Sequence, residues 1–144
     1  MKYTSVINVF ISHSWRYSNH YERLAGWLFE TQWGNERTSL QFIDKSIPES
    51  SPVHSAVNDQ ELAMAIFQRI DQSDVVVIPT GMYANYSRWI KTEIDGAQAF
   101  RRPIVAVDLW GADRKSSIVS KAANEIVGWS GKSVVNSSWR QSGK

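Results

Sequence analysis

The chain has 144 residues, of which 42% are hydrophobic and 21% charged, and its net charge is +2. This composition fits one compact domain over 1–144 with a substantial core. Because the Lys and Arg residues are scattered and the net charge is small, the sequence argues against nucleic acid as a partner. The absence of cysteine excludes disulfide frameworks, thiolate zinc sites and cysteine nucleophiles.

The sequence also lacks the signals that direct a chain to a membrane. No segment reaches the roughly 20 apolar residues that a membrane helix needs. The first residues, Met1 to Ile11, do not have the apolar length of a signal peptide. We therefore expect a cytoplasmic protein with no membrane partner.

Several apolar segments predict strands. Residues 75–78 are four consecutive β-branched residues, which is typical of a parallel strand that is buried on both faces. Residues 104–107 form an apolar run of the same buried type, and residues 6–11 are rich in residues that favour strands. Shorter strands are predicted at 40–43 and at 133–135, the second of these being the last in the chain.

Helical spacing of apolar residues separates these strands. We predict helices over about 21–33, 60–71, 87–97 and 116–127, and a frayed tail over 137–144 beyond a core of about 6–136. Alternating strands and helices predict βαβ units. The expected fold is a three-layer, flavodoxin-like α/β domain, with a five-stranded parallel sheet of order 2-1-3-4-5 and helices on both faces.

Polar residues follow the predicted strands, at the edge where open α/β sheets bind ligands. Ser12-His13-Ser14 follows the first strand and Pro79-Thr80-Gly81 follows the third. Glu93 lies on the next helix, one turn after Trp89, so that these two side chains share a helix face. A long, polar loop over 44–59, with two prolines and four serines, is also expected to be functional.

Common catalytic motifs are absent from the sequence. No Gly-rich dinucleotide or phosphate-binding motif follows a strand. Ser12, His13 and Asp108 would supply the residue types of a hydrolase triad, but there is no strand-to-helix nucleophile elbow. The three histidines have no paired ligand spacing, so no metal site is expected.

Four segments, taken in order, resemble one family. They are 8–15, 21–24, 81–94 and 102–107, and they are similar to the TIR-like domain of the Thoeris ThsB type over about 6–136. TIR domains share the flavodoxin-like sheet. The resemblance implies cleavage of NAD⁺ at the nicotinamide–ribose bond, with NAD⁺ as substrate and no separate cofactor or metal.

The family pattern of a Trp four positions before a catalytic Glu falls on Trp89 and Glu93. A carboxylate can stabilise the oxocarbenium-like charge that develops on the ribose, and an aromatic ring can stack on the nicotinamide. The other expected substrate-binding residues come from the loop after the first strand and from the loop before Trp89. They are Ser12, His13, Ser14, Trp15, Tyr83 and Tyr86.

The resemblance also implies a role in antiphage defence. The product would be an ADP-ribose-derived signal, in cyclic form, that activates a partner effector, and TIR enzymes commonly need neighbouring copies, which implies a homo-oligomer. Two other hypotheses stay open. The chain could be a catalytically silent adaptor that uses the 44–59 loop, or a sensor that binds a nucleotide without chemistry.

Overall fold

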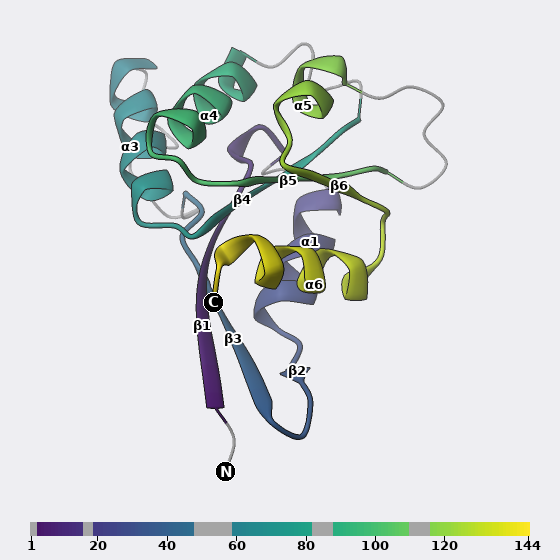
Figure 1. Ribbon diagram of the computed structural model, residues 1–144. Helices are drawn as coiled ribbons and strands as arrows, with labels where there is room; N and C mark the ends of the chain where they lie inside the picture. Colours follow the sequence, from purple (N-terminus) through teal and green to yellow (C-terminus); the bar gives the residue numbers. More distant parts are fainter. Residues whose placement is uncertain (1–2, 16–18, 48–58, 82–87, 110–115) are drawn as a thin grey trace.

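The computed structural model describes residues 3–15, 19–47, 59–81, 88–109 and 116–144. One six-stranded sheet forms the centre of the molecule, in the order β2-β3-β1-β4-β5-β6 (Figure 1). Its strands are β1 (Tyr3–Ile11), β2 (Trp33–Gly34), β3 (Thr38–Asp44), β4 (Val75–Pro79), β5 (Ile104–Val107) and β6 (Glu125–Val127). All neighbouring strands are parallel except β2, which is antiparallel to β3.

Helices cover both faces of the sheet. They are α1 (Asn19–Phe29), α3 (Asp59–Asp71), α4 (Arg88–Ala99), α5 (Ser117–Ala122) and α6 (Gly131–Ser142), and a short 3₁₀ helix, η1 (His13–Trp15), follows β1. In Figure 1, α3, α4 and α5 lie on one side of the sheet, and α1 and α6 on the other. The expected three-layer α/β architecture is therefore confirmed.

The core explains why the central strands are the most apolar. Every residue of β4 and β5 is buried, because both strands lie in the middle of the sheet with helices on each face. β1 begins exposed and becomes buried only towards its carboxyl end, where Val9 to Ile11 pair with Val75 to Val77. In the part of the chain that the structure describes, no helix combines the length and apolar character needed to span a membrane.

The sheet differs from the prediction at its two edges. The five strands that run parallel follow the predicted order 2-1-3-4-5, and β2 adds a sixth, antiparallel strand. The predicted last strand at 133–135 is wrong, because these residues lie in α6, where the Ser130 hydroxyl accepts a hydrogen bond from the Ser133 N–H and caps the helix. Val134 and Val135 are buried on that helix, and two adjacent β-branched residues imitate a strand.

The predicted helix over 116–127 is correct only in its first half. Asn124 ends it by pairing with β5: its side-chain oxygen accepts a hydrogen bond from the Ile104 N–H, and its own N–H donates to the Ile104 carbonyl. The chain then continues as β6, which is the last strand of the sheet. Long-range pairing thus overrides a weak helical pattern.

The end of the chain is not the frayed tail expected over 137–144. α6 continues to Ser142, and Gly143 closes it in the left-handed conformation with φ of 74°. The Lys144 ammonium then donates to the Val6 carbonyl at 3.0 Å and to Asp74 Oδ2 at 2.9 Å. The chain terminus is therefore attached to the amino-terminal side of the sheet.

Asp74 is the centre of this attachment. Burial raises the pKa of its carboxyl group, but hydrogen bonds from the Asn8 backbone and from Lys144, together with the charge of Lys144, bring the pKa below its ordinary value. The Asn8 N–H donates to Asp74 Oδ2 at 2.8 Å, so one carboxylate connects the residue before β4, the strand β1 and the last residue of the chain.

We expect Asp74→Asn to lower the free energy of unfolding by about 1 kcal/mol at pH 7, a modest value because the pair is partly exposed to solvent. Since the folded pKa of Asp74 lies below the unfolded one, its stabilising effect is present above the unfolded pKa and is lost as the pH falls through the folded pKa. Denaturant titrations from pH 7 to pH 2 would measure this, with Asp95→Asn on the exposed face of α4 as control. A difference that stays constant down to pH 2 would show that the charge is not responsible.

Candidate active site

The candidate site lies at the carboxyl ends of β1, β4 and β5. In open α/β sheets this edge forms the ligand-binding crevice, because the chain leaves neighbouring strands towards opposite faces. Here β1 leads through η1 towards α1 on one face, whereas β4 leads to α4 on the other (Figure 1). We call this edge of the sheet the strand-end site; its residues are Ser12, His13, Thr80, Glu93 and Asp108.

Glu93 is the most unusual residue of this site. It lies on α4 and is fully buried, although carboxylates are rarely buried unless they are hydrogen-bonded. The N–H of His13, the first residue of η1, donates to Glu93 Oε1 at 2.7 Å. This hydrogen bond holds the carboxyl group near the end of β1.

The local sequence explains how α4 delivers Glu93. Ile90, Ile94 and Ala97 recur at helical spacing and are buried against the sheet. Gly96 allows α3 to approach closely, because a Cβ at this position would lie 2.7 Å from Cδ1 of Phe67. Glu93 therefore reaches the strand ends from a helix that is packed on two sides.

η1 connects Glu93 to the opposite helix layer. Its first residue, His13, binds Glu93. Its last residue, Trp15, is 5% exposed and packs edge-on against His20 of α1, with 5.4 Å between the ring centroids. His20 contacts Trp129 in the same edge-on way at 5.5 Å. Gly81 makes room for Trp15, because a Cβ there would lie 2.7 Å from Trp15 Cη2.

The other predicted site residues fall into two groups. Ser12 is fully buried at the end of β1, its N–H donates to the Val77 carbonyl at 2.9 Å, and its hydroxyl has no hydrogen-bond partner among the described residues. Trp89, in the first turn of α4, is partly buried and packs against the core. The Ser14 backbone belongs to η1, but its side chain lies outside what the structure describes.

Two predicted residues and most of one loop cannot be placed. Tyr83 and Tyr86 lie in 82–87, and 48–58 make up most of the predicted 44–59 loop; all of these are outside the described residues. The described start of that loop does reach the sheet, since the Ser46 hydroxyl accepts a hydrogen bond from the Ile11 N–H at 2.9 Å.

A second polar pair at this edge was not predicted as part of the site. Thr80 follows β4 and is fully buried, and its hydroxyl donates to Oδ1 of Asp108, which follows β5, at 2.7 Å. The available signal was an acidic residue directly after a buried strand. In the sequence, Asp108 stood out only as a possible member of a hydrolase triad, which the missing nucleophile elbow argues against.

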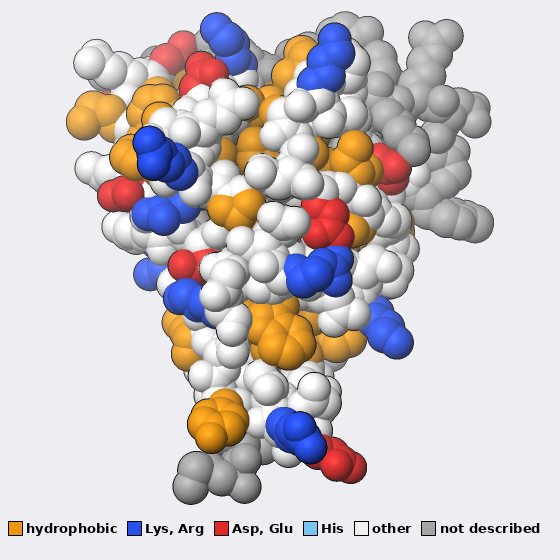
Figure 2. Space-filling view, in the orientation of Figure 1, with side chains coloured by type: hydrophobic (Ala, Val, Ile, Leu, Met, Phe, Trp, Pro, Cys, Tyr) orange, Lys and Arg blue, Asp and Glu red, His pale blue; other side chains and the backbone are white. Residues whose placement is uncertain are grey.

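Metal binding has no visible basis in the described ranges, since they contain no group of three or more His, Asp or Glu residues that could hold an ion. The surface is also mixed in charge. Figure 2 shows Lys and Arg side chains interspersed with Asp and Glu on the face that it presents.

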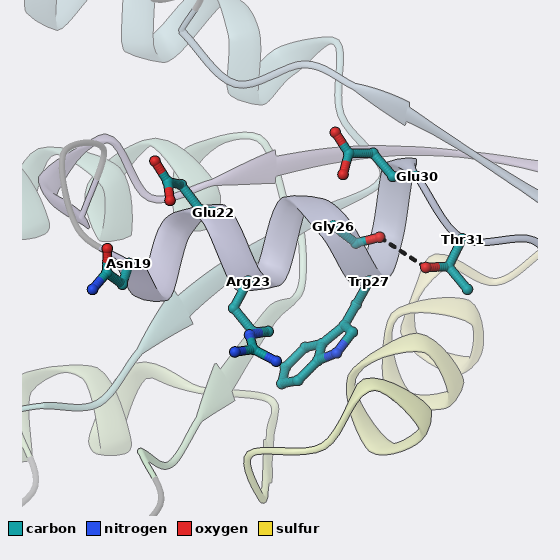
Figure 3. Close-up of a pocket in the computed structure, with 7 residues that line it drawn as sticks. All are labelled: Asn19, Glu22, Arg23, Gly26, Trp27, Glu30 and Thr31. Carbon is teal, nitrogen blue, oxygen red and sulfur yellow. Dashed lines mark hydrogen bonds between the residues drawn. The ribbon is translucent and has the colours of Figure 1, made fainter.

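A depression of about 580 Å³ lies elsewhere, along the exposed side of α1. Figure 3 shows that its side chains diverge: Glu22 and Glu30 point to one side of the helix, and Arg23 and Trp27 to the other. The hydrogen bond drawn there joins the Thr31 hydroxyl to the Gly26 carbonyl at the end of α1. We do not assign this depression as the site, because its polar groups do not converge on a ligand.

Comparisons with known proteins agree with this fold. A family model described as "Thoeris protein ThsB, TIR-like domain" matches residues 10–114. No curated protein matches the chain by sequence.

Two solved structures share the fold. One is the CMP N-glycosidase BcmB from Clostridium botulinum, with 14% identity, a TM-score of 0.56, and coverage of 90% of this chain and 96% of that one. The other is the FeoB G-domain from Methanococcus jannaschii, with 10% identity, a TM-score of 0.56, and complete coverage of both chains. At these identities the likeness shows the fold alone.

We expect Gly81→Ala to disturb the site through Trp15. The new methyl group would lie 2.7 Å from both Trp15 Cη2 and Leu109 Cδ1, so the free energy of unfolding should fall by about 1–3 kcal/mol. Because Trp15 ends η1, the His13 N–H should be held less firmly on Glu93. Hydrogen exchange of the His13 amide should then become faster.

Gly128→Ala is the matched control, since nothing lies within 4 Å of the added methyl group. It should leave both stability and the His13 amide unchanged. A destabilised Gly81→Ala protein whose His13 amide exchanges at the normal rate would show that Trp15 does not position η1.

Proposed function

The chain belongs to the Thoeris ThsB TIR-like domain family, and on this basis we propose that it cleaves NAD⁺ at the nicotinamide–ribose bond with Glu93 as the catalytic carboxylate. The observation that carries the proposal is the position of Glu93. It is a fully buried carboxylate at the ligand-binding edge of the sheet, and the His13 N–H fixes one of its oxygens.

The chemistry needs such a group. When the bond between the ribose C1′ and the nicotinamide nitrogen breaks, the electron pair leaves with nicotinamide and positive charge develops on the ribose. A carboxylate that is already oriented, in a site with little water, stabilises this charge without reorganising. Water, or a nucleophilic atom of the same substrate molecule, then adds to C1′ and releases a proton.

The remaining residues would shape the substrate pocket. Ser12 supports this role because its hydroxyl is buried at the strand end beside the residue that holds Glu93. Trp89 is assigned to stack on the nicotinamide, one helix turn before Glu93. Roles for Ser14, Tyr83 and Tyr86 rest on the family resemblance.

The biological role follows from the family. We assign the product as an ADP-ribose-derived signal, in cyclic form, that activates a partner effector in antiphage defence. NAD⁺ is then the substrate, with no separate cofactor, and assembly of several copies would raise activity by favouring the competent form.

Glu93→Gln tests the proposal, because the amide keeps the size of the side chain and removes its charge. We expect nicotinamide release to fall at least about 100-fold while the fold is retained. Mass spectrometry of small molecules would follow nicotinamide and ADP-ribose products after concentrated protein is incubated with NAD⁺, with and without lysate of infected cells. CMP is included as an alternative substrate, because one fold neighbour is described as a CMP N-glycosidase.

Glu30→Gln is the control, since Glu30 is an exposed carboxylate on the depression along α1. Its turnover should equal that of the unaltered protein. Unchanged turnover in Glu93→Gln would remove Glu93 from the mechanism. Folded protein that releases nothing under any condition would favour the adaptor, and saturable NAD⁺ binding without product would favour the nucleotide sensor.

A further inference from the structure

The hydrogen bond between Thr80 and Asp108 creates a second polar position in the strand-end site. Both backbone polar groups and the hydroxyl of Thr80 are hydrogen-bonded. Its N–H donates to the Val107 carbonyl at 2.9 Å, and its carbonyl accepts from the Ser116 N–H. Its hydroxyl donates to Asp108 Oδ1 at 2.7 Å. The Asp108 N–H donates to the Val127 carbonyl at 2.8 Å. The Asp108 carboxylate is thus oriented before any ligand arrives.

This carboxylate lies at the same edge of the sheet as Glu93, but at the end of a different strand. β1 and β5 are the two neighbours of β4, and adjacent strands are about 4.8 Å apart, so the ends of β1 and β5 are separated by about 10 Å. His13, which holds Glu93, follows β1, whereas Asp108 follows β5.

Apolar side chains fill the space beside Gly81, which lies between these two positions. Gly81 follows β4, and the space that its side chain would fill is occupied by Trp15 from the β1 side and Leu109 from the β5 side. A ligand that used both carboxylates would therefore have to be long, with hydroxyl or amine donors at its two ends.

A dinucleotide has this form, because two ribose diols are separated by a pyrophosphate. We propose that Asp108 accepts hydrogen bonds from the diol of the ribose that does not react, and that it thereby selects NAD⁺ over NADP⁺. This inference rests on the proposed function. One carboxylate can accept both hydroxyl donors of a diol, whereas a 2′-phosphate removes a donor and brings like charges together.

Binding to a catalytically inactive background separates this inference from the proposed function. In Glu93→Gln protein, calorimetry should show that NAD⁺ binds at least about tenfold more tightly than NADP⁺, the effect expected for a hydrogen bond to a charged group. Adding Asp108→Asn should remove most of this preference by weakening NAD⁺ about tenfold. Adding Asp95→Asn, which removes an exposed carboxylate of α4, should leave the preference unchanged.

Thr80→Val provides a second variant that keeps the carboxylate but removes the hydroxyl that orients it. It should lower the preference for NAD⁺ over NADP⁺ by a smaller factor than Asp108→Asn does. This test does not require that the Asp108→Asn protein folds. In otherwise unaltered protein, Asp108→Asn should change the ratio of kcat/KM for the two substrates mainly through KM.

The outcomes are distinct. A preference that is the same with and without Asp108→Asn, in protein with an unchanged melting temperature, would overturn the role of Asp108 and leave the NAD⁺ proposal standing. If Thr80→Val lowers stability but leaves the preference for NAD⁺ over NADP⁺ unchanged, the Thr80–Asp108 pair is structural. That result would also overturn the role of Asp108 in substrate selection. Failure of Glu93→Gln to bind NAD⁺, together with no turnover by the unaltered protein, would overturn both proposals.

Discussion

The hydrogen bond from the His13 N–H to Glu93 is the interaction on which the site depends. A buried carboxylate is costly, and it is tolerated where oriented donors replace the water that it has lost. Here the donor is a backbone amide, which has no rotamers and cannot move unless the chain moves. The position of Glu93 is therefore set by the position of η1 relative to α4, that is, by the packing of two helix layers across one sheet edge.

Because η1 must be fixed for the His13 N–H to reach Glu93, the packing on the other side of the sheet also matters for the site. η1 has only three residues, so the same short segment that donates to Glu93 must also place Trp15 between Gly81 and His20. The edge-on contacts continue to Trp129, just before α6. His20 of α1 and Trp129 therefore contribute to the site without facing it, because they limit where η1 can lie. This accounts for some of the seven Trp residues in so short a chain.

The sequence predicted those features that depend on local pattern. The buried central strands came from apolar runs, and their order came from the alternation of strands with helices. Helical spacing placed Glu93 on α4 near the strand ends. Features that depend on distant partners could not be predicted in this way. The end of the chain was expected to fray because its partner, Asp74, lies 70 residues away, and the pairing of Thr80 with Asp108 spans 28 residues. Burial of Glu93 was equally hidden, since its donor is the backbone of His13, 80 residues earlier.

Backbone amides in or near β1 hold the carboxyl groups of Asp74 and Glu93. Asp74 serves stability, whereas Glu93 is assigned to chemistry, and their surroundings differ accordingly. Asp74 accepts from the Asn8 N–H at the amino end of β4 and is paired with Lys144, so its charge is already balanced by a cation of the chain. Glu93 accepts from the His13 N–H at the carboxyl ends of the strands, where ligands of this fold bind. Under the proposed function, this carboxyl group meets the positive charge that develops on the ribose. The same device therefore anchors the chain at one end of the sheet and, under the proposed function, prepares the reaction at the other.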